Sequence, residues 1–385
     1  MQQDLFFGNR FGKDLLSQRN GVLFDMRSTN ILIIMTIRSL FYISSFLLFT
    51  GITSIQCSSS DDTDDTSNPS EPTVYAAGRE SYKAKYWKNG TAVLLGTGSG
   101  SSDVKGMAIV GEDLHSVGFE INSAGKYVAK YWKNGVATDL TDGSRDAYAN
   151  DIFISGNDVY IAGQEMKPGE TTYAAKYWKN GVATNLNDEA QNVIATGIAV
   201  VGNDVYVIGE RRMQNWITPV TYYWKNGQRS DLSDQTTTAN DQDITVSGND
   251  IYMMWSVAYN SSGQLQTRYS KNLATPTLIE DGTSYAGGTA IAVKGSDVYI
   301  AGTGSLPNSQ SLVSKYWKNG SPVILGSDDS AALSLDVSGN DIYIAGYQTV
   351  PGGGSEAVYW KNGKAQQITS GTGSGMIRQI FVKQQ

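Results

Sequence analysis

The chain has 385 residues, of which 40% are apolar and 17% are charged, and glycine contributes 42 residues against 8 prolines. This composition favours tight turns between short strands over long helices. A single cysteine excludes an intramolecular disulfide and a cysteine-rich zinc site, and a single histidine excludes chemistry that needs a histidine cluster. The net charge of −7 argues against nucleic acid as a partner.

Residues 39–55 (SLFYISSFLLFTGITSI) form an uncharged, mostly apolar run that lies between Arg38 and Cys57. The run is shorter than the ~20 residues of a typical membrane-spanning helix, so it fits the core of a signal peptide better. An uncleaved membrane anchor is the alternative. Met35 offers a conventional start, which makes residues 1–34 a possible upstream extension and residues 35–56 the predicted signal peptide.

The segment before Cys57 (Ser54-Ile55-Gln56) resembles a bacterial lipobox, although Gln56 stands where a small residue is usual. Residues 57–72 continue with serines and acidic residues and contain no base, so we expect a disordered acidic tether. A cysteine followed by serine and acids is similar to the surface-export signal of Bacteroidota lipoproteins. The resemblance implies lipidation of Cys57 and an extracytoplasmic position, anchored to the outer membrane and facing the cell surface.

Residues 73–385 contain seven copies of one unit. Its marker, Tyr-Trp-Lys-Asn-Gly, occurs at 86–90, 131–135, 177–181, 223–227, 316–320 and 359–363, with a degenerate copy at 269–273. Each copy holds four short strand signals, with a Gly-Asn-Asp type turn between the first two and Asn-Gly between the last two. Asn-Gly favours a hairpin turn in which both residues take positive φ. Four antiparallel strands per repeat are typical of a β-propeller blade.

The two ends of the repeat region complement each other. The first copy begins at its second strand, at residues 73–78, and the chain ends with a first strand at residues 377–382. We therefore predict an all-β, seven-bladed β-propeller of four-stranded antiparallel blades, closed by the C-terminal strand pairing with the N-terminal strands. Closure removes exposed strand edges.

Small residues in the first strand of each copy predict that this strand is the innermost, because blades converge on the axis. They are Gly106, Ala108, Gly197, Ala199, Ala290 and Ala292. The tryptophans of the marker are expected to pack between neighbouring blades. His115 occupies a column otherwise held by tyrosine, which predicts a packing role for it.

The marker distinguishes this chain from WD, kelch and sialidase repeats, whose own motifs are missing. The repeat region resembles secreted or lipid-anchored propellers of Bacteroidota that carry Trp-Lys-Asn-Gly repeats. That resemblance implies the fold and no particular activity.

The two short, uniform turns of each copy are predicted to share one face, which leaves the variable loops on the other. Function tends to lie on variable loops held by a rigid frame. Departures from the repeat point to a ligand-binding site on that face, made of Arg211, Arg212, Trp216, Trp255 and Tyr259. Tryptophan beside arginine can stack a sugar ring and bind its hydroxyl or acidic groups. The alternative is drift in one copy, with Trp255 filling the space left by Ser270.

Paired carboxylates are the only candidates for catalysis in the sequence. Asp151, Asp243 and Asp336 lie on first strands near the predicted channel, with Asp146 and Asp241 close by. Two of them at a suitable separation would serve a glycoside hydrolase. Acids are abundant in this chain, however, and we name no catalytic residue. No motif for a cofactor or a metal is present, so we expect neither.

These observations favour a monomeric, lipid-anchored binding module that engages a glycan or a protein through the variable-loop face. The membrane would be reached through the lipid anchor only. Two alternatives stay open: a glycoside hydrolase or lyase that uses the channel carboxylates, and a structural component of an outer-membrane assembly.

Overall fold

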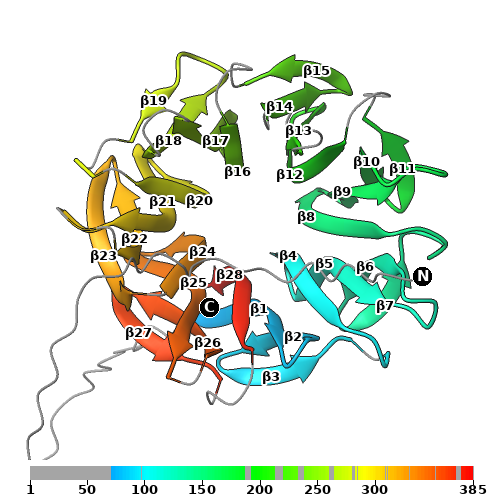
Figure 1. Cartoon of the computed structure of the whole chain (residues 1–385), viewed down its shortest axis with the longest axis horizontal. Coiled ribbons are helices and arrows are strands. Elements are labelled where there is room, and N and C mark those ends of the chain that lie inside the picture. Colours follow the sequence, from blue (N-terminus) through cyan, green and yellow to red (C-terminus); the bar gives the residue numbers. More distant parts are fainter. Residues whose placement is uncertain are drawn as a thin grey trace, which may run out of the picture. The chain divides into compact units, whose positions relative to one another are not determined.

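The computed structural model describes residues 71–96, 98–186, 192–212, 220–232, 238–259, 264–279, 282–283, 285–307, 309, 311–328, 330–351, 353–369 and 374–384. The predicted signal peptide, Cys57, nearly all of the acidic tether and Trp216 lie outside these residues. All regular structure that the model describes is β-strand, in seven sheets arranged as a ring (Figure 1). A search of the described segments for a helix able to cross a membrane found none.

Every sheet has four antiparallel strands, and the strand that comes first in each repeat is the innermost. Blade 1 consists of β28 (Met376–Lys383), β1 (Thr73–Glu80), β2 (Lys83–Lys88) and β3 (Thr91–Leu94). Blades 2 to 4 consist of β4 (Ser102–Val110), β5 (Asp113–Ile121), β6 (Tyr127–Lys133) and β7 (Val136–Asp139); β8 (Ala147–Ser155), β9 (Asp158–Met166), β10 (Tyr173–Lys179) and β11 (Val182–Asn185); and β12 (Val193–Val201), β13 (Asp204–Arg211), β14 (Val220–Lys225) and β15 (Gln228–Asp231). Blades 5 to 7 consist of β16 (Thr238–Ser247), β17 (Asp250–Tyr259), β18 (Gln264–Lys271) and β19 (Thr277–Leu278); β20 (Ala286–Lys294), β21 (Asp297–Ser305), β22 (Leu312–Lys318) and β23 (Ser321–Asp328); and β24 (Ser330–Ser338), β25 (Asp341–Val350), β26 (Gly354–Lys361) and β27 (Lys364–Gln367).

The ring closes through blade 1, where β28 at the end of the chain pairs with β1 at the start of the repeat region. The register runs from Thr73 opposite Lys383 to Arg79 opposite Met376. The prediction of a seven-bladed ring sealed by its own two ends is confirmed, including the inner position of the first strand.

The marker tryptophans form wedges between successive blades, as predicted. Trp224 of blade 4, for example, packs against Tyr160, Ala175 and Leu186 of blade 3. The six equivalent side chains are all at most 1% exposed: Trp87, Trp132, Trp178, Trp224, Trp317 and Trp360. Burying such a ring contributes on the order of a few kcal/mol, so these residues are a main source of cohesion between blades.

The rest of the marker builds one face of the ring, which we call the turn face. Both residues of each Asn-Gly turn have positive φ, for instance 51° at Asn180 and 83° at Gly181. The Asn180 amide oxygen accepts the Val159 backbone N–H at 2.9 Å, and its nitrogen donates to Asp158 at 2.8 Å. Lys179 pairs with the same Asp158 at 2.8 Å. Because Asp158 belongs to the Gly-Asn-Asp turn, the two kinds of turn do lie on one face.

His115 is a packing residue, as the tyrosine column predicted. Its side chain is buried, and Nδ1 hydrogen bonds with the Tyr131 hydroxyl at 2.7 Å. Burial lowers the pKa of the imidazole, which keeps it neutral near pH 7.

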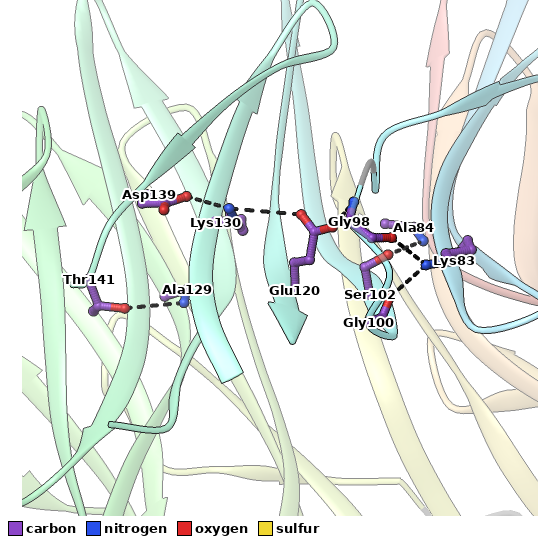
Figure 2. Close-up of polar contacts among 10 residues, drawn as sticks. All are labelled: Lys83, Ala84, Gly98, Gly100, Ser102, Glu120, Ala129, Lys130, Asp139 and Thr141. Atoms are coloured by element: carbon purple, nitrogen blue, oxygen red, sulfur yellow. Dashed lines mark hydrogen bonds and ion pairs between the residues drawn. The ribbon is translucent and has the colours of Figure 1, made fainter. Parts of the chain in front are cut away.

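The opposite face carries the loops that lead from one blade to the next, and we call it the loop face. Figure 2 shows how the connection from blade 1 to blade 2 is held: Lys83 Nζ donates to the carbonyls of Gly98 and Gly100, both at 2.6 Å. Glu120 accepts the Gly98 backbone N–H, and Ser102 Oγ accepts that of Ala84 at 2.8 Å. This part of the loop face is therefore a fixed platform.

Candidate functional site

Each innermost strand contains one β-bulge near the loop face, where a single extra residue is left out of the pairing with the second strand. In blade 2, for example, Val104 pairs with Gly118 and Gly106 pairs with Val117, so Lys105 is the extra residue. The seven extra residues, which we call the bulge ring, are Lys105, Asn150, Thr196, Asp241, Thr289, Leu333 and Arg378. Bulges re-aim side chains and are common next to functional sites.

A column of glycines on the second strand makes these bulges possible. A Cβ at Gly118 would lie 2.0 Å from the carbonyl oxygen of Asp103, and one at Gly163 would lie 2.0 Å from that of Tyr148. The same clash with the first strand occurs at Gly78, Gly209, Gly302 and Gly346. The bulged strand thus brings its backbone to the place where a side chain would stand, so only glycine fits there.

Blade 5 is the exception, and it shows that the position of the bulge depends on the residue in the glycine column. Trp255 stands in the glycine column, and here the bulge moves by one pair, so that Gln242 faces Trp255 and Asp241 becomes the extra residue. Asp241 takes a positive φ of 50°. The substitution in the second strand therefore changes the backbone of the first.

The bulge ring surrounds the mouth of the central channel on the loop face. A cavity of about 320 Å³ follows the inner strands, and a second of about 520 Å³ lies at the mouth. Both are lined by Thr196, Thr289, Leu333 and Arg378 of the bulge ring. The bulge ring thus offers one side chain per blade around the mouth, of six residue types in all.

The neutral polar members of the ring also connect neighbouring blades. The Asn150 amide donates to the Ala195 carbonyl at 2.7 Å, and the Thr289 hydroxyl donates to that of Ala332 at 2.7 Å. Thr196 Oγ1 donates to Gln242 at 3.3 Å. These contacts fix the positions of the ring residues.

Blades 1 and 2 carry a group of cations, Arg79, Lys105 and Arg378, around the buried carboxylate of Asp103; we call it the basic arc. Asp103 Oδ2 lies 3.2 Å from Arg378 Nη2, 3.5 Å from Arg79 Nη1 and 3.9 Å from Lys105 Nζ. The three cationic side chains remain about one quarter exposed. Burial, followed by the repulsion of Arg378, lowers the pKa of Lys105 to about 8.

Four aromatic side chains on blades 2 and 3 form a second group, the aromatic row. The Phe119 ring lies 5.2 Å from Tyr127 and 5.3 Å from Tyr148, and Tyr148 lies 4.9 Å from Tyr127 and 6.0 Å from Tyr173. The three tyrosines are half-buried, and burial raises the pKa of the Tyr148 phenol. Aromatic faces and hydroxyls held in this way suit stacking against a ring with polar edges.

The basic arc and the aromatic row are parts of one rim. Lys105 Nζ lies 5.9 Å from the centre of the Phe119 ring. Arg212, the residue after β13, lines the cavity at the mouth, and its charge acts on both Lys105 and Tyr173. The arc of blades 1 and 2 therefore adjoins the row of blades 2 and 3 through Lys105 and Phe119.

The residues predicted from departures in the repeat have different outcomes. Arg212 lies at the mouth, 3.7 Å from Glu210, and Arg211 is the last residue of β13. Trp216 and the side chain of Tyr259 lie outside the described residues, so their predicted role stays a prediction.

Trp255 needs a correction, because its ring is only 1% exposed and packs with Val257 and Leu232. Such a side chain offers no face to a ligand, so the prediction of stacking by Trp255 is wrong. In other blades the residue equivalent to Leu232 packs on a marker tryptophan, as Leu186 does on Trp224. Trp255 thus occupies the space left by Ser270, which was the alternative interpretation.

The channel carboxylates lie on inner strands as predicted, but they hold neighbouring blades together. Asp243 accepts the backbone N–H of Ile244 and that of Ile291 in blade 6, both at 2.8 Å. Asp151 likewise accepts Ile198 N–H of blade 4 at 2.9 Å, and Asp336 accepts Val382 N–H of blade 1 at 2.7 Å.

Burial raises the pKa of Asp151 to about 6 and that of Asp243 to about 7. Engagement of both oxygens of Asp243 favours a structural role over catalysis.

Within the described ranges, no three His, Cys, Asp or Glu side chains are grouped so that they could hold a metal ion.

No protein-family model matches the chain, and comparison with curated protein sequences finds no match. Among solved structures, it is similar to a puromycin-hydrolysing peptidase of Mycobacterium tuberculosis, with 12% identity and a TM-score of 0.51 over 74% of this chain and 49% of that one. It is also similar to the β-propeller domain of the trilobed protease from Pyrococcus furiosus, with 13% identity and a TM-score of 0.46 over 79% of this chain and 96% of that one. The chain spans about half the length of the mycobacterial peptidase. At such identities the likeness shows the propeller fold alone.

The sequence contains a signal for the bulge ring that the repeat markers obscure. If the six copies that have the second-strand glycine are aligned on it, one first-strand column varies between Lys, Asn, Thr, Leu and Arg, while the residue before it is always small or apolar. Variation at one position of an otherwise constant repeat indicates that the position is not needed for the fold.

Proposed function

We propose that this protein is a binding module that holds a glycan at the channel mouth on the loop face, with the aromatic row as its stacking platform. The observation that carries the proposal is the row itself: four rings on two adjacent blades, each in contact with at least one other, with three half-buried tyrosines. Ring contacts of this kind are rigid, so little side-chain entropy is lost when a sugar stacks on them.

The surroundings of the row fit a polar ring better than an apolar partner. The Tyr148 and Tyr173 rings lie 6.0 Å apart, and Asp146 accepts the Tyr127 backbone N–H at 3.1 Å. Lys105 and Arg212 flank the row. Pyranose rings present an apolar face and hydroxyl groups at the edge, and this combination of aromatic faces with charged donors is complementary to both.

The location in this proposal comes from the sequence. Lipidation at Cys57 would place the module outside the cytoplasm on the outer membrane, where polymers from the surroundings reach it. A protein ligand or a structural role within an outer-membrane assembly is the competing possibility, and stoichiometric co-purification of another protein from detergent extracts would support it.

The test is a glycan-array screen followed by calorimetry with the best ligand, on wild type and on Tyr127→Ala, Tyr148→Ala and Tyr173→Ala. We expect each variant to bind at least ~10-fold more weakly, equivalent to about 1.4 kcal/mol. Tyr347→Ala is the matched control, because Tyr347 is an equally half-buried tyrosine on blade 7. Equal losses in all four variants, or unchanged binding in the first three, would overturn the proposal.

A further inference from the structure

The basic arc is short of negative charge. Its three cations share one carboxylate oxygen, Asp103 Oδ2, at distances of 3.2 to 3.9 Å. Charge-assisted hydrogen bonds are usually about 2.7–2.9 Å long, so Asp103 meets only part of the donor capacity of Arg79 and Arg378. The arc carries three positive charges and one negative, although the whole chain has a net charge of −7.

One buried donor in the arc supports this. Nε of Arg79 has no hydrogen-bond partner among the described residues. Native proteins pair nearly all such donors, so the arc retains donor capacity that its own carboxylate does not use. The lowered pKa of Lys105 reports the same crowding of positive charge.

We infer that the basic arc binds an acidic group of the ligand, a carboxylate or a sulfate ester on the sugar chain whose rings stack on the aromatic row. The inference rests on the proposed function for the row. The two groups are adjacent, since Lys105 belongs to the arc and lies 5.9 Å from the Phe119 ring of the row. Two arginines offer planar forks that suit a carboxylate or a sulfate, and Lys105 adds a third donor from the channel side. The ligand is then an acidic polysaccharide and not a neutral one.

The experiment compares pairs of polymers that differ only in charge. Polygalacturonate, alginate and hyaluronan are each titrated beside their methyl-esterified forms, and a sulfated galactan is titrated beside its desulfated form. We expect the acidic member of at least one pair to bind ~10-fold or more tightly than its neutral partner, with affinity that falls as salt is raised.

Two substitutions in the arc locate this preference. Arg378→Gln removes the closest cation. Lys105→Met removes a cation whose only ion pair with a described residue is long, so the second variant keeps the fold if the first weakens it. Each is expected to reduce the preference for the acidic polymer at least threefold. Lys364→Gln on the exposed strand β27 changes the net charge equally and should leave the preference unchanged. Amine labelling at pH 8 adds a local measurement: the acidic polymer should slow labelling of Lys105 and not of Lys364.

The outcomes separate this inference from the proposed function. Binding of both members of every pair with equal affinity, lost in Tyr148→Ala and unaffected in Arg378→Gln, overturns the inference and leaves the proposed function standing. Charge-dependent binding that needs Arg378 and not Tyr148 supports the arc and overturns the role of the row. Absence of binding to every polymer overturns both. A preference for the sulfated pair alone identifies the acidic group as a sulfate ester, and a preference for the uronate pairs alone identifies it as a carboxylate.

Discussion

The two faces of the ring are built on opposite plans. On the turn face, blade after blade repeats the same asparagine, lysine and aspartate with the same bonds, as in Asn180, Lys179 and Asp158. On the loop face, the bulge ring carries six residue types in seven blades, and only threonine occurs twice. Copies that agree at one end and differ at the other indicate that the turn face serves stability and, under the proposed function, that the loop face serves recognition.

The largest effect on the free energy of unfolding is expected from glycine-to-alanine substitutions, and it should differ between the loop face and the turn face. Gly118→Ala would bring a Cβ to 2.0 Å from the Asp103 carbonyl oxygen, so we expect the free energy of unfolding to fall by about 3 kcal/mol. Gly111→Ala on the turn face meets open space and suffers only from its φ of 59°, for a loss of about 1 kcal/mol. Urea denaturation measures both. Equal losses would show that the close carbonyl is not what requires glycine.

The next effect tests whether the turn face serves stability alone. Asn180→Ala removes the acceptor of the Val159 N–H and replaces asparagine, which tolerates a φ of 51°, by a residue that tolerates it less, for an expected loss of about 2 kcal/mol with unchanged glycan affinity. Asn180→Gly keeps the backbone conformation accessible and should lose about 1 kcal/mol less. A change in glycan affinity in either variant would contradict the division between the faces.

The pH dependence of stability should have opposite signs at the channel and at the turn face. Burial raises the pKa of Asp243 to about 7, so between about pH 4 and 7 the folded protein binds a proton that the unfolded chain has lost. Wild type should therefore lose stability relative to Asp243→Asn as pH rises through that window, by at most ~1.4 kcal/mol per pH unit.

Asp158 provides the counterpart to this measurement. Its hydrogen bond from Lys179 lowers the pKa of its carboxyl, so wild type should lose stability relative to Asp158→Asn as the pH falls below about 4. Chemical denaturation of the three proteins from pH 3 to 8 checks both signs. Parallel curves for wild type and Asp243→Asn would remove the argument that this carboxyl is held protonated.

The smallest effect is expected within the bulge ring. Leu333 lines both cavities and lies where other blades have Asn or Thr, so Leu333→Thr should change the free energy of unfolding by no more than ~0.5 kcal/mol. Thermal unfolding measures it. A loss of several kcal/mol would mean that the ring residues are part of the core and not a variable surface.

Most of the architecture could be predicted from the sequence because it follows from repetition. The spacing of the marker fixes seven units, the complementary ends at 73–78 and 377–382 imply closure, and Asn-Gly specifies the hairpin turn. The same repetition showed His115 to be a substituted tyrosine. Each of these features can be recognised in the sequence itself, before it is known which strand residues pair with each other.

The site was harder to predict because it depends on pairing between strands. Lys105 and Arg378 reach the mouth only because each is the unpaired residue of a bulge, and the aromatic row joins side chains from four separate strands. Blade 5 does depart from the repeat, but the departure is structural, since Trp255 fills the space of the marker tryptophan that this blade lacks. Of the residues predicted for ligand binding and described by the structure, Arg212 is the one that lines the cavity at the mouth.

The direction in which the chain enters the ring decides how the module would stand on a surface. β1 begins at Thr73 beside Lys383, and Glu71 just before it lies 3.9 Å from Lys361 of a Lys-Asn-Gly turn. The described chain thus enters the ring at the end of the blades that carries the uniform turns. If the residues before it form the lipidated tether that the sequence predicts, the attachment point lies on the turn face and leaves the loop face, with the channel mouth, free to meet long polymers.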